Sequence, residues 1–212
     1  MQLKMMIRSH RSYQYAQKVL REEVNAPKYV VAQCAEFKNI ADGHDKKYCI
    51  NEKMAVKIDK LLKLMIMPKG LRAGLSVYDA TVGYQWLFYI STLCVVYREN
   101  INKRRYETAI LEIARKNFKT YTVAIVFLLL LLLEPSFSKL YSVAPDGSLS
   151  REIKSAIEEI IAVSPCLRPE NAPEQVFKTR RDDIFCKLNH NDYIPLNYSN
   201  SRLDGKLPSV FL

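Results

Sequence analysis

Residues 109–120 have the sequence Ala-Ile-Leu-Glu-Ile-Ala-Arg-Lys-Asn-Phe-Lys-Thr, and a largely apolar run continues from there to Leu133. This order predicts a buried strand over 110–114, a basic turn that ends in Lys119 and Thr120, and a helix over 119–133. A phosphate-binding loop needs these parts, because helix N-terminal N–H groups, a flexible lysine and a hydroxyl on Mg²⁺ together hold a triphosphate. Lys119 and Thr120 are the predicted lysine and hydroxyl.

The match to the pattern G-x-x-x-x-G-K-[ST] is partial, since its glycine positions fall on Ile113 and Phe118. An ordinary exposed helix start with Lys-Thr is the alternative interpretation. Glycine tolerates a positive φ and a close approach of phosphate, whereas a bulky side chain disfavours both. If the loop holds phosphate, we therefore expect Phe118 to keep a negative φ and to turn its ring toward the following helix or a neighbouring strand.

The run Arg-Lys-Asn-Phe-Lys-Thr over 115–120 resembles the deviant phosphate loop of the large terminase subunits of tailed bacteriophages, where Arg-Lys-Asn-Gly-Lys-Ser is a common form. Gln85, in Tyr-Gln-Trp, stands where that family places a glutamine that recognises the adenine edge. Residues 139–145 resemble the family's second strand, and residues 203–212 resemble the approach to its Walker B strand. The resemblance covers roughly residues 28 to 212.

The resemblance implies an α/β fold: an incomplete P-loop NTPase-type parallel sheet core over 106–212, preceded by a helical region over 1–105 that contains the adenine-reading segment. It implies ATP and Mg²⁺ as ligands. The implied roles are Lys119 on the β- and γ-phosphates, Thr120 on Mg²⁺, Arg115 or Lys116 at the γ-phosphate, the amides of Lys116, Asn117, Phe118, Lys119 and Thr120 as the phosphate cradle, and Gln85 on adenine. The family's Walker B Asp-Glu pair is not among these residues, so we expect almost no hydrolysis.

The intact family uses ATP hydrolysis to drive double-stranded DNA into a procapsid through the portal protein, and a C-terminal nuclease then cuts the DNA. The resemblance therefore implies duplex DNA, the portal protein and the small terminase subunit as partners, and a homo-oligomeric ring as the working assembly. It also implies the cytoplasm of an infected or lysogenic bacterial host as the location, no membrane partner, and no place in the mature virion.

The positive charge of the chain is concentrated in its first part. Residues 1–120 hold 22 Lys and Arg against 11 Asp and Glu, whereas residues 121–212 hold 10 against 11. This asymmetry favours a polyanion partner, for which DNA is the natural candidate, and Lys103, Arg104 and Arg105 form one basic cluster. A merely solvated surface is the alternative for that cluster. A non-catalytic basic helical protein that binds nucleic acid through 1–105 is the second functional hypothesis.

The leucine-rich run 123–133 suggests a third hypothesis, a peripheral membrane protein, but 11 residues are too few for a spanning helix, which needs about 20. A buried core helix is the preferred interpretation. The five cysteines contain no C-x-x-C pair, which indicates neither a disulfide framework nor a zinc site and agrees with a reducing cytoplasm.

Periodicity and capping residues predict the remaining elements. Asn51 is a candidate N-cap. Helices are expected over 11–24, 28–40, 51–67, 84–97 and 150–162, a loop or lid over 69–80, a second strand over 140–144, and irregular structure with short strands over 164–198.

Overall fold

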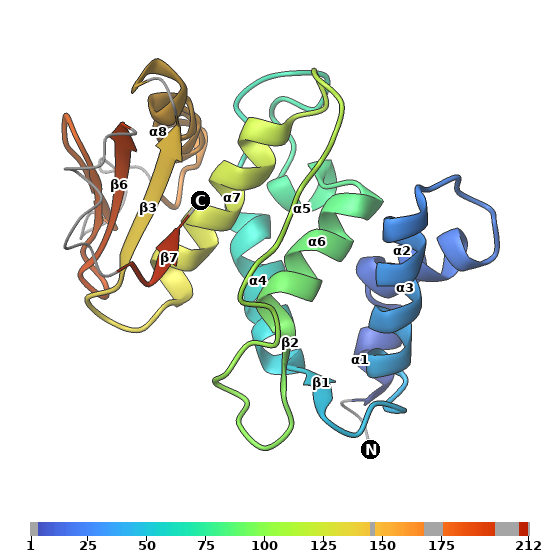
Figure 1. Cartoon of the computed structure of the whole chain (residues 1–212). Coiled ribbons are helices and arrows are strands. Elements are labelled where there is room, and N and C mark those ends of the chain that lie inside the picture. The colour runs from blue at the N-terminus through green and yellow to red at the C-terminus, as the bar shows by residue number, and fades with distance from the viewer. Residues whose placement is uncertain (1–3, 145–146, 168–175, 198–207, 212) are drawn as a thin grey trace. The chain divides into compact units, whose positions relative to one another are not determined.

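The computed structural model describes residues 4–144, 147–167, 176–197 and 208–211 (Figure 1). The chain divides into two compact units. The first contains residues 1–60 and 81–112, and the second contains residues 61–80 and 113–212. Residues 61–80, which the sequence placed in the helical N-terminal region, therefore belong to the second unit.

The first unit is mainly helical. Its elements are α1 (Lys4–Ser9), α2 (Arg11–Leu20), α3 (Lys28–Ala41), most of α4 (Glu52–Leu64), α6 (Gly83–Cys94) and the strands β1 (Tyr48–Ile50) and β2 (Val95–Tyr97). Helix α2 packs against α3 and α6, and Phe37, Trp86 and Tyr89 are buried. The Oδ1 atom of Asn51 accepts the N–H of Met54 at 3.1 Å, which confirms the predicted N-cap.

The helix predicted over 84–97 ends early. Residues 95–97 form β2 and pair antiparallel with β1, in the register Tyr48 with Tyr97 and Ile50 with Val95. Two consecutive valines favour this extended conformation, since β-branched side chains fit a strand better than a helix. The first unit therefore contains a two-stranded ribbon that the sequence analysis did not predict.

The second unit is built on a five-stranded mixed sheet with the order β4-β5-β6-β3-β7. Its strands are β3 (Lys139–Ala144), β4 (Phe177–Thr179), β5 (Ile184–Cys186), β6 (Asn191–Asn197) and β7 (Val210–Phe211). Strand β3 is parallel to β6 and β7, not to the strand expected over 110–114, and β4, β5 and β6 are antiparallel. Only short turns connect these three strands, and a parallel connection needs a crossover of about a dozen residues. The α/β class is confirmed, and the wholly parallel sheet is wrong.

The second unit also contains the helices α5 (Val77–Ala80), α7 (Lys119–Leu133) and α8 (Gly147–Val163). Helix α7 has the predicted bounds, and its residues 128–131 are buried, as expected for a core helix. The ring of Phe127 lies 4.8 Å from that of Tyr193 on β6, measured between centroids. Within the described residues, no helix is both long and apolar enough to cross a membrane.

The strand predicted over 110–114 is wrong. Residues 107–114 form neither helix nor strand, and Ile110 is 86% exposed. A strand requires a neighbour that accepts and donates its backbone hydrogen bonds, and no described strand pairs with this segment. The apolar pattern alone therefore misidentified an exposed connection that leads into α7.

Candidate phosphate-binding loop

Residues 115–118 form a turn directly before α7, and its backbone has an unusual conformation. Lys116 has φ of 67°, and Phe118 has φ of 56° and ψ of 28°, so both lie in the left-handed region. The negative φ expected for Phe118 is wrong. The left-handed conformation costs a non-glycine residue roughly 1–2 kcal/mol, and such strain is concentrated at functional sites. The turn thus adopts at Phe118 a conformation that glycine adopts without strain.

The side-chain amide of Asn117 stabilises this turn. The Nδ2 atom of Asn117 donates to the carbonyl oxygens of Ala114 at 3.3 Å and Arg115 at 3.4 Å. Asparagine side chains commonly hold tight turns through such local bonds. Asn117, predicted as part of the phosphate cradle, therefore also helps to fix the shape of the loop.

The Phe118 ring packs to one side of the turn, and its residue is 41% exposed. The ring lies directly on Gly70, where an added Cβ would stand 2.6 Å from Cε1 and Cζ. Its centroid is 6.4 Å from that of Tyr121 in the first turn of α7. The ring therefore packs on α7, as expected, and also on Gly70, a contact that no sequence pattern indicated.

Lys119 and Thr120 are the first two residues of α7, not interior helical positions. Lys119 is exposed and Thr120 is half-buried. The carbonyl oxygen of Phe118 accepts both the N–H and the Oγ1 hydroxyl of Thr122 at 2.9 Å. Because the first N–H groups of a helix have no intrahelical acceptor, this end of α7 favours an anion.

The start of α7 lies toward the carboxyl ends of the parallel strands. At the opposite end of the helix, the carbonyl oxygen of Leu131 accepts from Nδ2 of Asn189 at 2.8 Å and of Asn191 at 3.2 Å, and Asn191 begins β6. Helix α7 therefore ends beside the amino end of β6 and runs opposite to β3 (Figure 1). Open α/β sheets bind ligands outside the carboxyl ends of their strands.

The cations of the loop are not neutralised. Arg115, Lys116 and Lys119 are exposed, and none forms an ion pair with a carboxylate of the described residues. Three positive charges therefore lie within five residues of a helix N-terminus. This arrangement attracts a polyanion such as a triphosphate.

Glu159 of α8 lies beside the first turn of α7 and has other partners. Oε1 of Glu159 on α8 is 2.8 Å from Nζ of Lys69, and its Oε2 accepts the hydroxyl of Tyr121. Burial and the bond to Glu159 raise the pKa of Tyr121 to about 12. The hydrogen bond to Glu159 raises the pKa of Lys69. Lys69 thus compensates Glu159 and leaves the charges of the loop available, although no sequence motif indicated that Lys69, Glu159 and Tyr121 meet.

Gln85 lies in α6 of the first unit, whereas residues 115–120 lie in the second. The Oε1 atom of Gln85 accepts the N–H of Val82 at 2.9 Å, and the residue is buried. This bond satisfies one of the free donors at the start of α6. The position predicted for adenine recognition therefore also has a capping role.

The described residues contain no group of three or more His, Cys, Asp or Glu that could hold a metal ion. Thr120 remains the residue of the loop with a suitable hydroxyl for Mg²⁺. The chain matches no family model, no curated protein and no solved structure.

Proposed function

We propose that residues 115–120 bind the phosphates of ATP, and that the chain is the N-terminal ATPase portion of a large terminase subunit, whose intact form couples ATP hydrolysis to packaging of double-stranded DNA into procapsids. The principal support is the position of three exposed cations, Arg115, Lys116 and Lys119, which lie at the start of α7 and form no ion pair with a carboxylate of the described residues. The start of that helix lies toward the carboxyl ends of the parallel strands. These features together fit a polyphosphate.

The proposed roles follow from side-chain chemistry. Lys119 neutralises charge on the β- and γ-phosphates, and Arg115 or Lys116 reaches the γ-phosphate. The amides from Lys116 to Thr120 donate to phosphate oxygens. Mg²⁺ would further neutralise the phosphates when bound, and the Thr120 hydroxyl would be a protein ligand for it.

Hydrolysis needs two further carboxylates, one to complete the metal shell and one to orient the water. Neither is assigned among the described residues. Asp204 lies within 203–207, which is outside the described residues, and we do not assign it as a substitute. We therefore expect the chain to bind nucleotide weakly and to hydrolyse almost none.

The partners proposed for the intact protein are duplex DNA, the portal protein and the small terminase subunit, with a homo-oligomeric ring as the working assembly and the bacterial host cytoplasm as its location. These depend on the family resemblance. The ATP-binding role can be tested without them.

The test is calorimetric titration of the 212-residue chain with Mg·ATP, beside Lys119→Ala and the control Lys178→Ala, which removes an exposed lysine from β4. A charge-assisted contact contributes about 1.5–3 kcal/mol, and 1.4 kcal/mol is a tenfold change in Kd. We expect Lys119→Ala to weaken binding at least tenfold and Lys178→Ala to have no effect. Equal affinity in all three proteins would reject the phosphate site.

The second candidate, a non-catalytic basic protein that binds nucleic acid, is favoured by four exposed residues of the first unit that form no ion pair with a carboxylate of the described residues: Lys46, Lys47, Arg98 and Lys103. If the titration shows no nucleotide binding, this candidate becomes the leading one. The third candidate loses its basis, because the leucine run that suggested membrane association is buried in α7.

A further inference from the structure

The ribbon of the first unit, β1 and β2 with the flanking turns 44–47 and 98–105, gathers tyrosines and cations at one end of that unit. Tyr48 and Tyr97 are directly opposite each other in the register of the two strands. Opposed side chains share a face of the ribbon, and here the two rings meet edge to face at 5.0 Å between centroids. The pair forms a rigid base for the neighbouring cations.

Those cations lie over the tyrosine rings. The Nζ atom of Lys47 is 5.4 Å from the Tyr48 centroid and 5.3 Å from that of Tyr97. The Nζ atom of Lys103 is 4.9 Å from the Tyr97 centroid. An aromatic face restrains an ammonium group and leaves its charge uncompensated, whereas a carboxylate would neutralise it. The ribbon therefore holds Lys47 and Lys103 in place as full positive charges.

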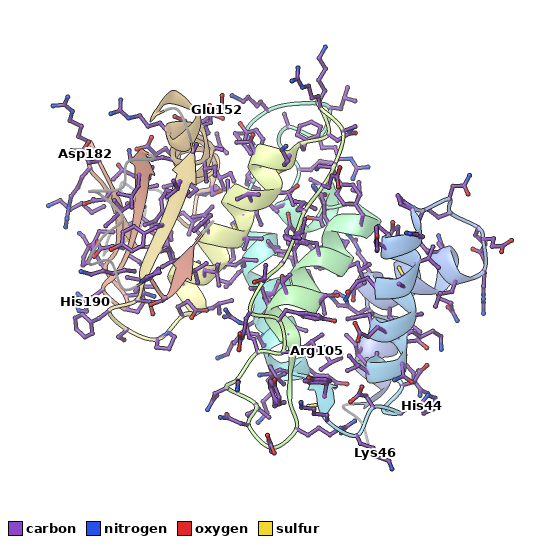
Figure 2. The ribbon with its side chains drawn as sticks, viewed as in Figure 1. His44, Lys46, Arg105, Glu152, Asp182 and His190 are labelled. Carbon is purple, nitrogen blue, oxygen red and sulfur yellow. The ribbon has the colours of Figure 1, made fainter. Side chains whose placement is uncertain are left out.

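The ribbon also has exposed cations at its edge, of which Arg98 donates through Nε to the carbonyl oxygen of Asp45 at 2.9 Å. Lys46, Lys47, Arg98 and Lys103 are exposed and form no ion pair with a carboxylate in the described part of the chain. Figure 2 shows Lys46 and Arg105 at this end of the unit. Residues 44–50 and 95–105 hold six Lys and Arg against two Asp and Glu. The ribbon and its flanking turns therefore carry a net positive charge.

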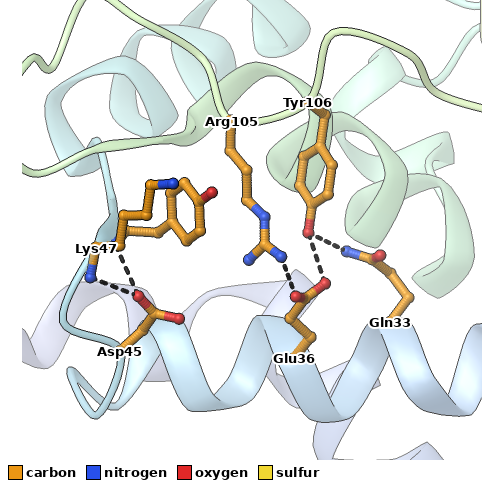
Figure 3. A network of polar contacts seen from close by, with 7 residues as sticks. Gln33, Glu36, Asp45, Lys47, Arg105 and Tyr106 are labelled. Carbon is orange, nitrogen blue, oxygen red and sulfur yellow. Dashed lines mark hydrogen bonds and ion pairs between the residues drawn. The ribbon is translucent and has the colours of Figure 1, made fainter.

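Two acidic residues, Glu36 on α3 and Asp45 on the turn before β1, stabilise the ribbon and its flanking turns (Figure 3). Glu36 of α3 pairs with Arg105 and accepts the hydroxyl of Tyr106 at 3.1 Å. Asp45 accepts the N–H groups of Lys47 and Tyr48, both at 2.8 Å, and these bonds lower the pKa of its carboxyl. Of the predicted cluster 103–105, Arg105 is therefore structural, and Lys103 is the exposed member with a free charge.

We propose that the ribbon is a contact surface for the phosphate backbone of duplex DNA. Proteins that bind single strands stack bases on aromatic rings, but here cations lie over Tyr48 and Tyr97. Unpaired, restrained cations without available rings suit a duplex backbone, and such contacts position the DNA without reading its sequence. The choice of DNA rests on the proposed function, whereas the location of the surface rests on the contacts above.

The test is fluorescence anisotropy of a labelled 30-base-pair duplex with the 212-residue chain across a salt series. The test variant is Lys47→Gln with Lys103→Gln. The matched control is Lys18→Gln with Lys28→Gln, which removes the same charge from exposed residues of the same unit. Lys28 begins α3, and β1 follows the far end of that helix, about 20 Å away along its axis. Circular dichroism verifies that all variants fold.

We expect the test variant to bind at least about tenfold more weakly at 0.1 M salt and its salt slope to fall by about two, since each phosphate contact contributes about 0.9 to that slope. Lys47→Arg with Lys103→Arg should restore binding, and the control should change affinity less than twofold. Equal losses in test and control variants would overturn the location. Stronger binding to a single strand that Tyr97→Leu abolishes, or binding only to anionic vesicles, would overturn the duplex partner.

The nucleotide site and the DNA-contact ribbon can be tested independently of each other. Nucleotide titration measures the loop in the second unit, and duplex binding measures the ribbon in the first. Loss of ATP binding in Lys119→Ala with intact DNA binding leaves the ribbon unaffected, and the converse result leaves the loop unaffected.

Discussion

The backbone at Phe118 leads to a prediction with an unusual sign. In the interior of a helix alanine is better than glycine, because glycine loses about 0.5–1 kcal/mol more conformational entropy on folding. At a φ of 56° the order reverses, since only glycine escapes the left-handed cost of roughly 1–2 kcal/mol. We therefore expect Phe118→Gly to be more stable than Phe118→Ala by about 0.5–1 kcal/mol.

Both variants also lose the ring that packs on Gly70 and Tyr121. Full burial of such a side chain contributes about 1.5–3 kcal/mol, and Phe118 is 41% exposed, so the loss is about 1–2 kcal/mol. Phe118→Ala should show this loss in full, and Phe118→Gly should recover part of it. Urea unfolding followed by far-ultraviolet circular dichroism measures the difference. Phe118→Ala at least as stable as Phe118→Gly would refute the left-handed backbone, and both variants should retain the nucleotide affinity of the wild type.

Three further predictions follow from the same structure. Gly70→Ala should destabilise the chain by about 1–3 kcal/mol in urea unfolding, because φ is +93° and the new Cβ meets the Phe118 ring, and adding Phe118→Gly should remove the steric part; no loss would contradict the contact. Burial opposes ionisation of Asp42, but Lys38, Tyr13 and Arg8 lower its pKa overall, so its stabilising effect is present above pH 4 and is lost as pH falls through the folded-state pKa. The destabilisation by Asp42→Asn should thus be largest near pH 7 and shrink toward pH 3. An equal effect at both pH values would show that the charge of Asp42 does not contribute to stability. The 212-residue chain should show no Mg²⁺-dependent phosphate release; release that Lys119→Ala abolishes would show that a catalytic acid lies within these residues.

The sequence predicted those elements whose signals are local. Helix α7 has its predicted bounds, and the buried run at 128–131 and the N-cap Asn51 are where their patterns indicated. The failures required non-local information. Residues 110–114 have a strand-like pattern and no pairing partner, and Val95–Tyr97 leave a helical pattern because they pair with residues 48–50. Strand pairing depends on distant segments, which the periodicity of one segment does not reveal.

In the candidate sites, too, local features could be predicted from the sequence and long-range contacts could not. Lys119 and Thr120 could be placed at a helix start from order alone, because a turn followed by an apolar helix is a local feature. The ion pair of Lys69 with Glu159 joins residues 90 positions apart, and the bond from Arg105 to Glu36 joins residues 69 apart. No short motif relates such pairs. The sequence therefore suggested a cluster at 103–105 without showing that one of its members is structural.

The central claim is that the amides from Lys116 to Thr120 hold phosphate, and amide NMR of the ¹⁵N-labelled chain tests it most directly. Titration with Mg·ATP, and separately with inorganic triphosphate, should shift the resonances of residues 116–121 in both cases. The same titrations of Lys119→Ala should leave them nearly unchanged. Shifts confined to other residues, or no shift at millimolar ligand, would contradict the phosphate-binding role of this loop.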